Sequence, residues 1–319
     1  MDVKDFLDEQ YSMIEDVKDT TFEYSNTIVV PLVSDSGLTY ESGDTKKGKI
    51  LESCVLFTDI RDSVNLNKNH HTDTMGKIYT AFTKGVLNTA TYYGGMVRNI
   101  IGDRVMVVFP EKDCYKNALY CATAIGNIAN FIDGVFKDVD FKCGIGIDYG
   151  EMHIIKVGVE KHSNENEENR NLIWIGKPAN LASRLCDVAG KTFKEKFFVV
   201  KGKFYHYNYW GAPSLIDPRA SGWYEETRKL SAEDIMKDMT YEGGRIFKSG
   251  IIDQSDFKLV EEEIQYKRVL ITDRVYQGYK NACPDDQDVK EGWWKEPSRE
   301  VKDVDCKVLE SGVVWSYNK

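Results

Sequence analysis

The sequence lacks the features that mark disulfide-rich, zinc-binding and membrane-spanning proteins. Its 319 residues include seven cysteines, an odd number with no Cys-x-x-Cys pair, so neither a disulfide framework nor a zinc site is indicated. No apolar run is long enough to cross a bilayer, and the acidic start, MDVKDFLDEQYSMIEDV, lacks the apolar core of a signal peptide. We therefore expect a cytoplasmic protein in a reducing compartment, with no membrane partner.

An excess of positive charge is also missing. The net charge is −9, which argues against a broad nucleic-acid partner because phosphate backbones attract clustered Lys and Arg. It leaves room for a local basic pocket that binds one triphosphate. Hydrophobic residues make up 42% and charged residues 29%, which is typical of a soluble globular protein. The length allows one or two domains.

The order of patterns predicts three regions. Residues 1–50 read as an N-terminal helix over 2–17 that packs on the body or a partner, an extended arm over 27–33 and a loop over 34–48. Residues 51–202 alternate strand and helix, with a hairpin on either side of Gly102–Asp103, and are expected to form an α/β domain. Residues 203–319 read as a β-rich extension that either closes the sheet of that domain or forms a small second domain.

Two acids stand at the ends of apolar runs. Asp59 closes the run that begins at Ser53, and Asp103 follows Gly102 in the turn of the expected hairpin. Two strands that each carry an Asp at a turn can bring their carboxylates together. Such a pair supplies the hard oxygen ligands that divalent cations take when they hold phosphates. Alone, each Asp is more simply a turn or capping residue.

A third polar element is the run Asn180–Leu181–Ala182–Ser183–Arg184. On a helix, Asn180 and Arg184 are four residues apart and point the same way. Beside two metal-binding acids they would supply a neutral hydrogen-bonding group and a cation for a reacting phosphate. The simpler alternative is that Arg184 forms a surface salt bridge.

Four segments carry a family resemblance: FTDIRDS (57–63), IIGDRVMVVF (100–109), CGIGIDYGE (143–151) and WIGKPANLASRL (174–185). In order and spacing they resemble the class III nucleotide cyclase homology domain. The resemblance covers about residues 51–201. It implies an α/β (α+β) fold with a ferredoxin-like palm sheet flanked by helices, which works as a head-to-tail homodimer with active sites at the interface.

The resemblance also implies roles for individual residues. Asp59 and Asp103 would hold two Mn²⁺ or Mg²⁺ ions per site, with the backbone carbonyl of Ile60 as a further ligand. Asn180 would orient the ribose and Arg184 would neutralise charge at the α-phosphate, both from the other subunit. One ion would lower the pKa of the attacking 3′-hydroxyl and the other would bind the leaving oxygens. Backbone N–H groups from Arg61 to Val64, with Arg61 and Ser63, would hold the β- and γ-phosphates.

The chain departs from the family in two places. The phosphate loop reads Asp62–Ser63–Val64 where the family has Gly–Phe–Thr, so a third acid lies beside the triphosphate. In the base pocket, Asn99 replaces the Lys of purine cyclases, and Ile173, followed by Trp174, replaces the adenine-reading Asp. Phe57 lies two residues before Asp59 and so shares its strand face. It would stack on the base or crowd it, unless it is simply a core aromatic.

A filled pocket with an amide in place of Lys favours a smaller ring. In this respect the chain is similar to the Pycsar antiphage cyclases, the branch of the family that makes cyclic UMP or cyclic CMP, for which a separate effector senses the product. The amide of Asn99 can donate or accept a hydrogen bond, so it does not distinguish uracil from cytosine. UTP is the favoured substrate only because of the resemblance to this branch, and CTP remains an alternative. The alternatives are an adenylate or guanylate cyclase with an atypical pocket and a catalytically inactive nucleotide-binding regulator. A palm-type polymerase or diguanylate cyclase is disfavoured by the charge and by the residues after Gly94–Gly95.

Overall fold

The chain, in a computed structural model, forms two compact units. One is built from Met1–Lys191 together with Tyr266–Lys319, and the other from Thr192–Gln265. The structure describes residues 2–40, 45–158, 160–161, 164–165, 170–206, 222–231, 239–242, 245–248 and 251–317.

The larger unit holds most of the helices and a mixed sheet. Its elements are α1 (Val3–Asp19), β1 (Thr21–Asn26), β2 (Thr45–Ile60), α2 (Ser63–Asn69), α3 (Thr72–Tyr92), β3 (Met96–Ile101), β4 (Arg104–Val108), α4 (Cys114–Val135), β5 (Cys143–Val157), β6 (Glu160–Lys161), β7 (Asn164–Glu165), β8 (Asn171–Ile175), α5 (Lys177–Val188), β14 (Val269–Thr272), α7 (Asp273–Ala282), α8 (Gln287–Lys290) and β15 (Val308–Ser311).

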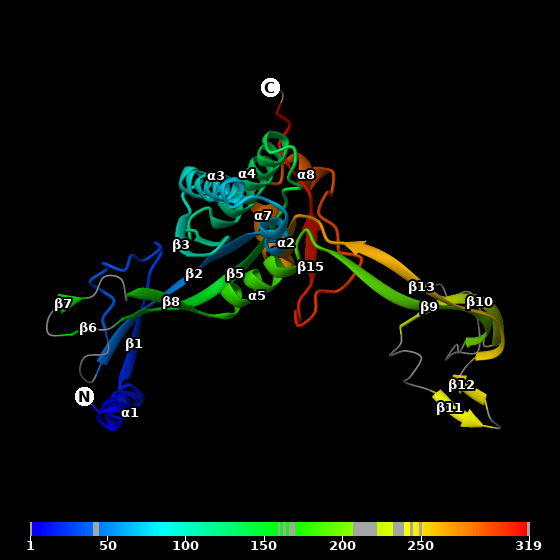
Figure 1. Ribbon diagram of the computed structural model, residues 1–319, viewed down its shortest axis with the longest axis horizontal. Coiled ribbons are helices and arrows are strands. Elements are labelled where there is room, and N and C mark those ends of the chain that lie inside the picture. The colour runs from blue at the N-terminus through cyan, green and yellow to red at the C-terminus, as the bar shows by residue number, and fades with distance from the viewer. Residues whose placement is uncertain are drawn as a thin grey trace. The chain divides into compact units, whose positions relative to one another are not determined.

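The sheet of this unit has eight strands in the order β15-β14-β5-β2-β4-β3, with β1 paired to β2 and β8 to β5 (Figure 1). Its centre is connected as β2-α3-β3-β4-α4-β5, and the neighbouring pairs β5–β2, β2–β4 and β4–β3 are all antiparallel. This β-α-β-β-α-β connectivity is that of ferredoxin-like units. The expected mixed α/β architecture, a sheet flanked by helices, is therefore confirmed.

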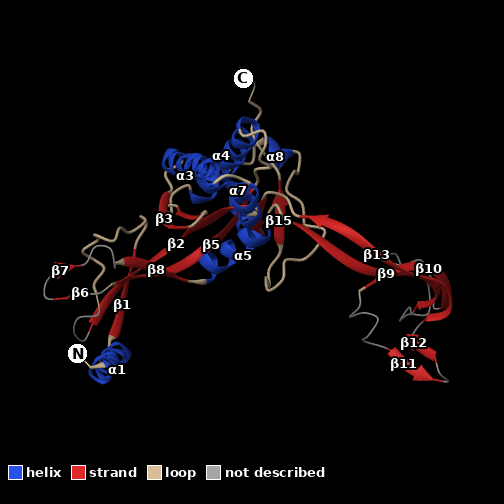
Figure 2. Cartoon of the chain, in the orientation of Figure 1, coloured by secondary structure: helices blue, strands red, loops and turns tan. Residues whose placement is uncertain are grey.

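The main apolar core lies between the sheet and α3, α4 and α7. Met75, Ile78, Phe82 and Val86 recur along α3 at helical spacing, and all four are buried in this core. Figures 1 and 2 show α3 and α4 on one side of β2 and β5, and α5 on the other. A smaller core lies on the α5 side, where Ala179 and Ala182 join side chains from the sheet. The cluster of buried apolar residues on the α5 side is thus smaller than the one on the side of α3, α4 and α7.

The C-terminal segment completes the large sheet. β14 runs parallel to β5, and β15 pairs antiparallel with β14. Two acids hold its helices in place. Asp286 accepts hydrogen bonds from Tyr120 of α4 (2.9 Å) and Tyr279 of α7 (2.7 Å), and the buried Asp288 accepts from Trp294 Nε1 (2.8 Å). The expected boundary at residue 202 treats 203–319 as one extension, whereas the structure groups Tyr266–Lys319 with Met1–Lys191.

The smaller unit is described by its strands. β9 (Thr192–His206) pairs antiparallel with β10 (Gly222–Leu230) and with β13 (Ile251–Gln265), and β11 (Met239–Glu242) pairs with β12 (Arg245–Lys248). Lys229 and Glu262 form an ion pair at 2.5 Å within this unit.

Some local details differ from the expectations. Residues 27–33, expected as an extended arm, form no strand; the strand β1 precedes them, and β2 begins at Thr45, inside the expected loop. Helix α1 forms as expected, but none of its residues is buried, so its expected packing on the body is not seen, and packing on a partner stays a prediction. Asp273–Ala282, within the expected β-rich extension, is helix α7. None of the helices in the described ranges is both long and apolar enough to cross a membrane.

Candidate active site

The ends of β2 and β4 bring Asp59 and Asp103 together. Thr58 of β2 lies opposite Val105 of β4, so the turn that precedes β4 folds back beside the end of β2. Gly102 adopts the left-handed φ of 63° that this tight turn requires. Burial raises the pKa of Asp103, and the negative charge of Asp59 raises it further. The end of β2 and the turn before β4 thus place Asp59 and Asp103 near each other, and their use as a pair stays a prediction.

One oxygen of this pair stands out. Asp103 Oδ2 is buried and has no hydrogen-bond partner among the described residues. Native proteins rarely leave a buried carboxylate oxygen unsatisfied, and functional sites are the usual exceptions. Two like-charged carboxylates with an unmet acceptor match the hard oxygen donors that Mg²⁺ and Mn²⁺ prefer. Within the described residues no group of three or more His, Cys, Asp and Glu side chains could hold a metal, so the site rests on this pair, and its role as a ligand set stays a prediction.

Asp59 differs from Asp103 because two arginines contact it. Arg104 Nη2 donates to Asp59 Oδ2 at 3.1 Å, and Arg61 Nη2 lies 3.4 Å from the same oxygen. Arg104 also donates through Nη1 to Ser183 Oγ at 3.1 Å and pairs with the carboxylate of Asp187. The end of β2 is thereby tied to the C-terminal half of α5.

Arg61 is turned into the protein, which corrects its expected contact with substrate. Its side chain is 6% exposed and donates to the backbone oxygens of Asp59 and Asp187, both at 3.2 Å. Its N–H donates to the carbonyl of Lys142 at 2.8 Å. Arg61 therefore has neither a free side chain nor a free N–H for phosphate, and it braces the site instead.

The next two residues of the expected phosphate loop, Asp62 and Ser63, lie at the start of α2. Asp62 adopts a left-handed φ of 55°, and its Oδ1 accepts from Asn65 Nδ2 at 2.7 Å. This third acid thus has its own partner on α2. The side chain of Ser63 lies close enough to Asp103 to lower that residue's pKa, against the larger effects of burial and Asp59. Ser63 is therefore beside the acid pair, and its role toward substrate stays a prediction.

Helix α5 approaches the sheet closely because β5 is glycine-rich at the contact. A Cβ at Gly146 would overlap the backbone of Ala182 and Cys186, and one at Gly144 would overlap the Ala189 carbonyl and the guanidinium of Arg61. Pro178 lies in the first turn of α5, where a missing N–H does no harm. The motif CGIGI thus positions the helix that carries Asn180 and Arg184.

Asn180 and Arg184 point outward from their own chain. Both are exposed on α5, and Arg184 Nη1 donates to the backbone oxygen of Asp303. The expected surface ion pair of Arg184 with an acid is replaced by this backbone contact. The described contacts do not place either residue against Asp59 or Asp103 of the same chain, so their expected use by a second subunit stays a prediction.

Phe57 and Asn99 share the face of the sheet on which Asp59 lies. Phe57 pairs with Met106 of β4, and beyond it Asn99 of β3 also lies opposite Met106, because a bulge at Arg98 shifts the register. Phe57 packs against the smaller core, which agrees with the core-aromatic alternative. Asn99 is partly exposed at the edge of that face.

Ile173 and Trp174 do not line one pocket within a chain, which corrects their joint assignment. They are adjacent on β8, and successive side chains of a strand point to opposite faces. Trp174 packs against the smaller core, where its Nε1 is buried without a partner among the described residues, while Ile173 is 44% exposed. At most one of them can face a given base.

Sequence reasoning missed three residues of the acid–arginine network: Arg104, Ser183 and Asp187. The signals were present, since Arg104 directly follows Asp103, and Ser183 and Asp187 are four apart on one helix. What the sequence did not reveal is that α5 packs close enough to the end of β2 for these side chains to meet.

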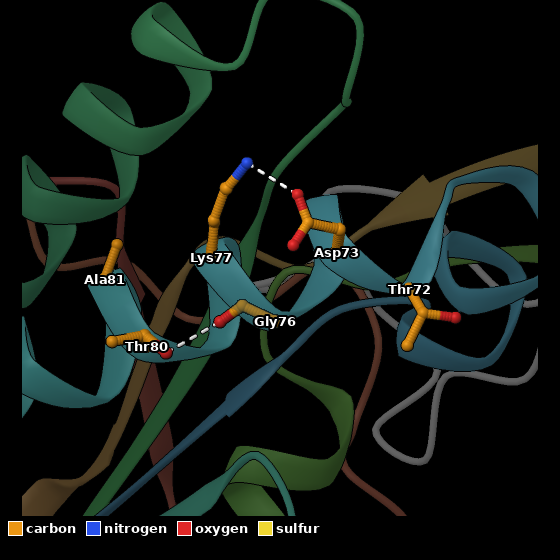
Figure 3. Close-up of a pocket in the computed structure, with 6 residues that line it drawn as sticks. All are labelled: Thr72, Asp73, Gly76, Lys77, Thr80 and Ala81. Carbon is orange, nitrogen blue, oxygen red and sulfur yellow. Dashed lines mark hydrogen bonds and ion pairs between the residues drawn. The ribbon is translucent and has the colours of Figure 1, made fainter.

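A separate hollow runs along the first turns of α3 (Figure 3). Its charged side chains, Asp73 and Lys77, pair with each other at 2.6 Å, and both are mostly exposed. All of its lining residues belong to one helix surface, so it has none of the convergent polar groups expected of a binding site. The lining residues are Thr72, Asp73, Gly76, Lys77, Thr80 and Ala81.

Comparisons with known proteins agree with the motif segments. No protein-family model matches the chain. A uridylate cyclase from Burkholderia cepacia is 27% identical over 143 residues, which are 43% of this chain and 59% of that enzyme. A uridylate cyclase from Gulbenkiania mobilis is 23% identical over 208 residues, or 58% of this chain and 79% of that enzyme. The chain thus matches less than two thirds of the Burkholderia enzyme.

Two further proteins are named for purine chemistry. The terminal-differentiation-specific adenylate cyclase of Dictyostelium discoideum is 26% identical over 41% of this chain and 6% of that protein. The crystal structure of adenylyl cyclase CyaB from P. aeruginosa is 14% identical and has a TM-score of 0.48, covering 85% of this chain and 97% of that chain. In sequence the chain is therefore similar to proteins named uridylate cyclase, in line with the resemblance of its four motif segments to the class III nucleotide cyclase homology domain.

Proposed function

We propose that the chain is a nucleotide cyclase that converts UTP, or CTP, to the 3′,5′-cyclic nucleotide and pyrophosphate. The observation that carries the proposal is the pair Asp59 and Asp103, held side by side with one buried carboxylate oxygen left without a partner. The relatives named uridylate cyclase favour UTP over the other nucleotides.

The reaction needs charge compensation and positioning more than a side-chain base. The 3′-hydroxyl attacks the α-phosphate, a P–O bond forms, and the bond to pyrophosphate breaks, with the hydroxyl proton passing to solvent. Divalent ions on Asp59 and Asp103 would lower the pKa of that hydroxyl and bind the leaving oxygens. Asn180 would fix the ribose, and Arg184 would place positive charge where it builds up on the phosphate.

In this proposal the site is shared between two copies of the chain. Asn180 and Arg184 are exposed on α5, and no described contact joins them to the acids of their own chain, so a second copy would present them to Asp59 and Asp103. The homodimer is then required for turnover, and each dimer holds two sites. If the chain signals as the Pycsar cyclases do, a separate protein that senses the cyclic product completes the pathway.

The first experiment is product analysis with purified chain, Mn²⁺ and each of ATP, GTP, CTP and UTP. We expect cyclic UMP as the main product and a loss of at least about 100-fold in Asp103→Ala. Asp73→Ala, which removes an exposed acid on α3, serves as the matched control. A clear preference for ATP or GTP would establish the purine alternative. Nucleotide binding without turnover in the parent would establish the inactive regulator.

A mixing experiment tests the shared site. Asp103→Ala and Arg184→Ala should each be inactive alone. In a random mixture half of the dimers are heterodimers, and each of those has one intact site of two, so about a quarter of the parent activity should return. No recovery after exchange of subunits would mean that both residues serve the same chain.

A further inference from the structure

Two arginines contact the same carboxylate in very different ways. Arg61 is 6% exposed, and its guanidinium contacts the backbone oxygens of Asp59 and Asp187 as well as the sulfur of Cys186 at 3.8 Å. It also lies beneath Gly144, whose missing Cβ leaves the space that the guanidinium fills. Arg61 therefore cannot leave Asp59 without breaking several buried contacts.

Arg104 has fewer and looser attachments. Its side chain is 27% exposed, and its contacts are three side chains: Asp59, Ser183 and Asp187. The Asp187 carboxylate is 51% exposed on α5. Because the same Nη2 atom already contacts both acids, Arg104 can give up Asp59 and keep its contacts with Asp187 and Ser183 Oγ.

A cation bound by Asp59 would change the balance between these two acids. The guanidinium and a divalent ion carry like charges and would compete for one carboxylate, which is 19% exposed and so only partly screened by water. Asp187 offers Arg104 an acceptor outside the acid pair. The fixed Arg61 has no such alternative.

We propose that Arg104 is a movable counter-ion of the metal site, and that Asp187 sets the affinity of Asp59 for a divalent ion by drawing Arg104 away from it. The inference rests on the proposed function in assigning Asp59 as a metal ligand. It adds two positioning residues, Arg104 and Asp187, whose roles are exerted through Asp59. It also gives α5 a part in its own chain's site as well as in the partner's.

The test is a double-mutant cycle read by Mn²⁺ binding alone, without nucleotide, using electron paramagnetic resonance of free Mn²⁺. Asp187→Asn should leave Arg104 on Asp59 and weaken Mn²⁺ binding about tenfold. Arg104→Met should remove the competing charge and tighten binding several-fold. In the Arg104→Met background, Asp187→Asn should have little further effect. Asp73→Asn is the matched control for loss of an exposed acid.

Several outcomes would overturn the inference. If Asp187→Asn weakens binding equally with and without Arg104, Asp187 acts through its own charge. If Arg104→Met weakens binding, Arg104 supports the ligand and does not compete with the ion. If the parent shows no Mn²⁺ binding that Asp59→Asn abolishes, the site is not a metal site. Thermal melting of each variant without Mn²⁺ shows whether it is folded. The Arg104→Lys variant keeps the positive charge at this position and so serves as a control for loss of that charge.

The inference and the proposed function fail separately. If Mn²⁺ binding follows the predicted cycle but the chain has no cyclase activity, the counter-ion role of Arg104 stands and the proposed enzyme function fails. If the chain makes cyclic UMP but its Mn²⁺ affinity does not depend on Arg104 and Asp187, the enzyme function stands and the counter-ion role fails.

Discussion

On the face of the sheet that α3, α4 and α7 cover, the buried side chains are large and apolar, with Phe82, Leu119 and Ile147 among them. The face beneath α5 is built on Gly144 and Gly146 and carries the acid–arginine network. The first face gains its stability from apolar burial. The second gives up apolar volume so that a helix bearing polar groups can approach the ends of two strands. The comparison implies that stability and chemistry depend on different faces.

The largest expected effect comes from damage to the apolar face. Phe82 is fully buried in the main core and contacts the ring of Phe141 with centroids 5.6 Å apart. Phe82→Ala should lower the free energy of unfolding by about 3–5 kcal/mol, because it leaves a cavity that the sheet and α4 cannot fill. Urea titration would measure this. At low temperature the folded variant should keep its Mn²⁺ affinity, and a parallel loss of Mn²⁺ binding would mean that the faces are not separable.

The α5 face should respond to added volume instead. Gly146→Ala would place a methyl group against the backbone of Ala182 and Cys186, so α5 must move outward. We expect a loss of about 1–3 kcal/mol in the free energy of unfolding. Turnover should fall by more than this destabilisation explains, because Asn180, Arg184 and Asp187 move with the helix. Gly134→Ala is the control, since a Cβ there meets nothing within 4 Å. Unchanged turnover in the folded variant would show that the position of α5 is not critical.

The same comparison explains how much the sequence could predict. The apolar face follows from periodicity: the helices at 72–92 and 114–135 and the hairpin around Gly102 have strong local signals. The start of β2 was missed because Lys46 reads as polar, although it is fully buried with its ammonium 5.5 Å from the ring of Phe22. Helix α7 was missed because its first residues, DRVY, directly follow the run VLIT, which is typical of a strand, and no turn residue separates the two.

The candidate site was predictable only where one residue carries its own signal. Asp59 and Asp103 stand at strand ends, and their meeting follows once the two strands pair. The inward turn of Arg61, and the contact of Arg104 with α5, depend on how closely that helix packs on Gly144 and Gly146. Such distances between elements far apart in sequence have no local signature. The opposite directions of Ile173 and Trp174 did have one, because they are neighbours on a strand.

The smallest expected effect concerns Asp103, whose Oδ2 is buried without a hydrogen-bond partner among the described residues. Burial and the charge of Asp59 raise the pKa of Asp103 from its usual value, so the folded state binds that proton more tightly than the unfolded state does. Stability of the parent should therefore fall as pH rises through the folded pKa of Asp103. Asp103→Asn lacks this pH-dependent contribution to the free energy of unfolding, because an amide does not titrate. It should be more stable than the parent at neutral pH, by about 1 kcal/mol, and the difference should close as the pH is lowered. Melting temperatures of the parent and of Asp103→Asn across a pH series measure this difference in stability.

Mn²⁺ should also reduce the difference in stability at neutral pH, because it binds the parent and so stabilises only that chain. A variant that is less stable than the parent at every pH would mean that the unsatisfied oxygen carries no energetic penalty, and the two faces would then differ in composition but not in cost.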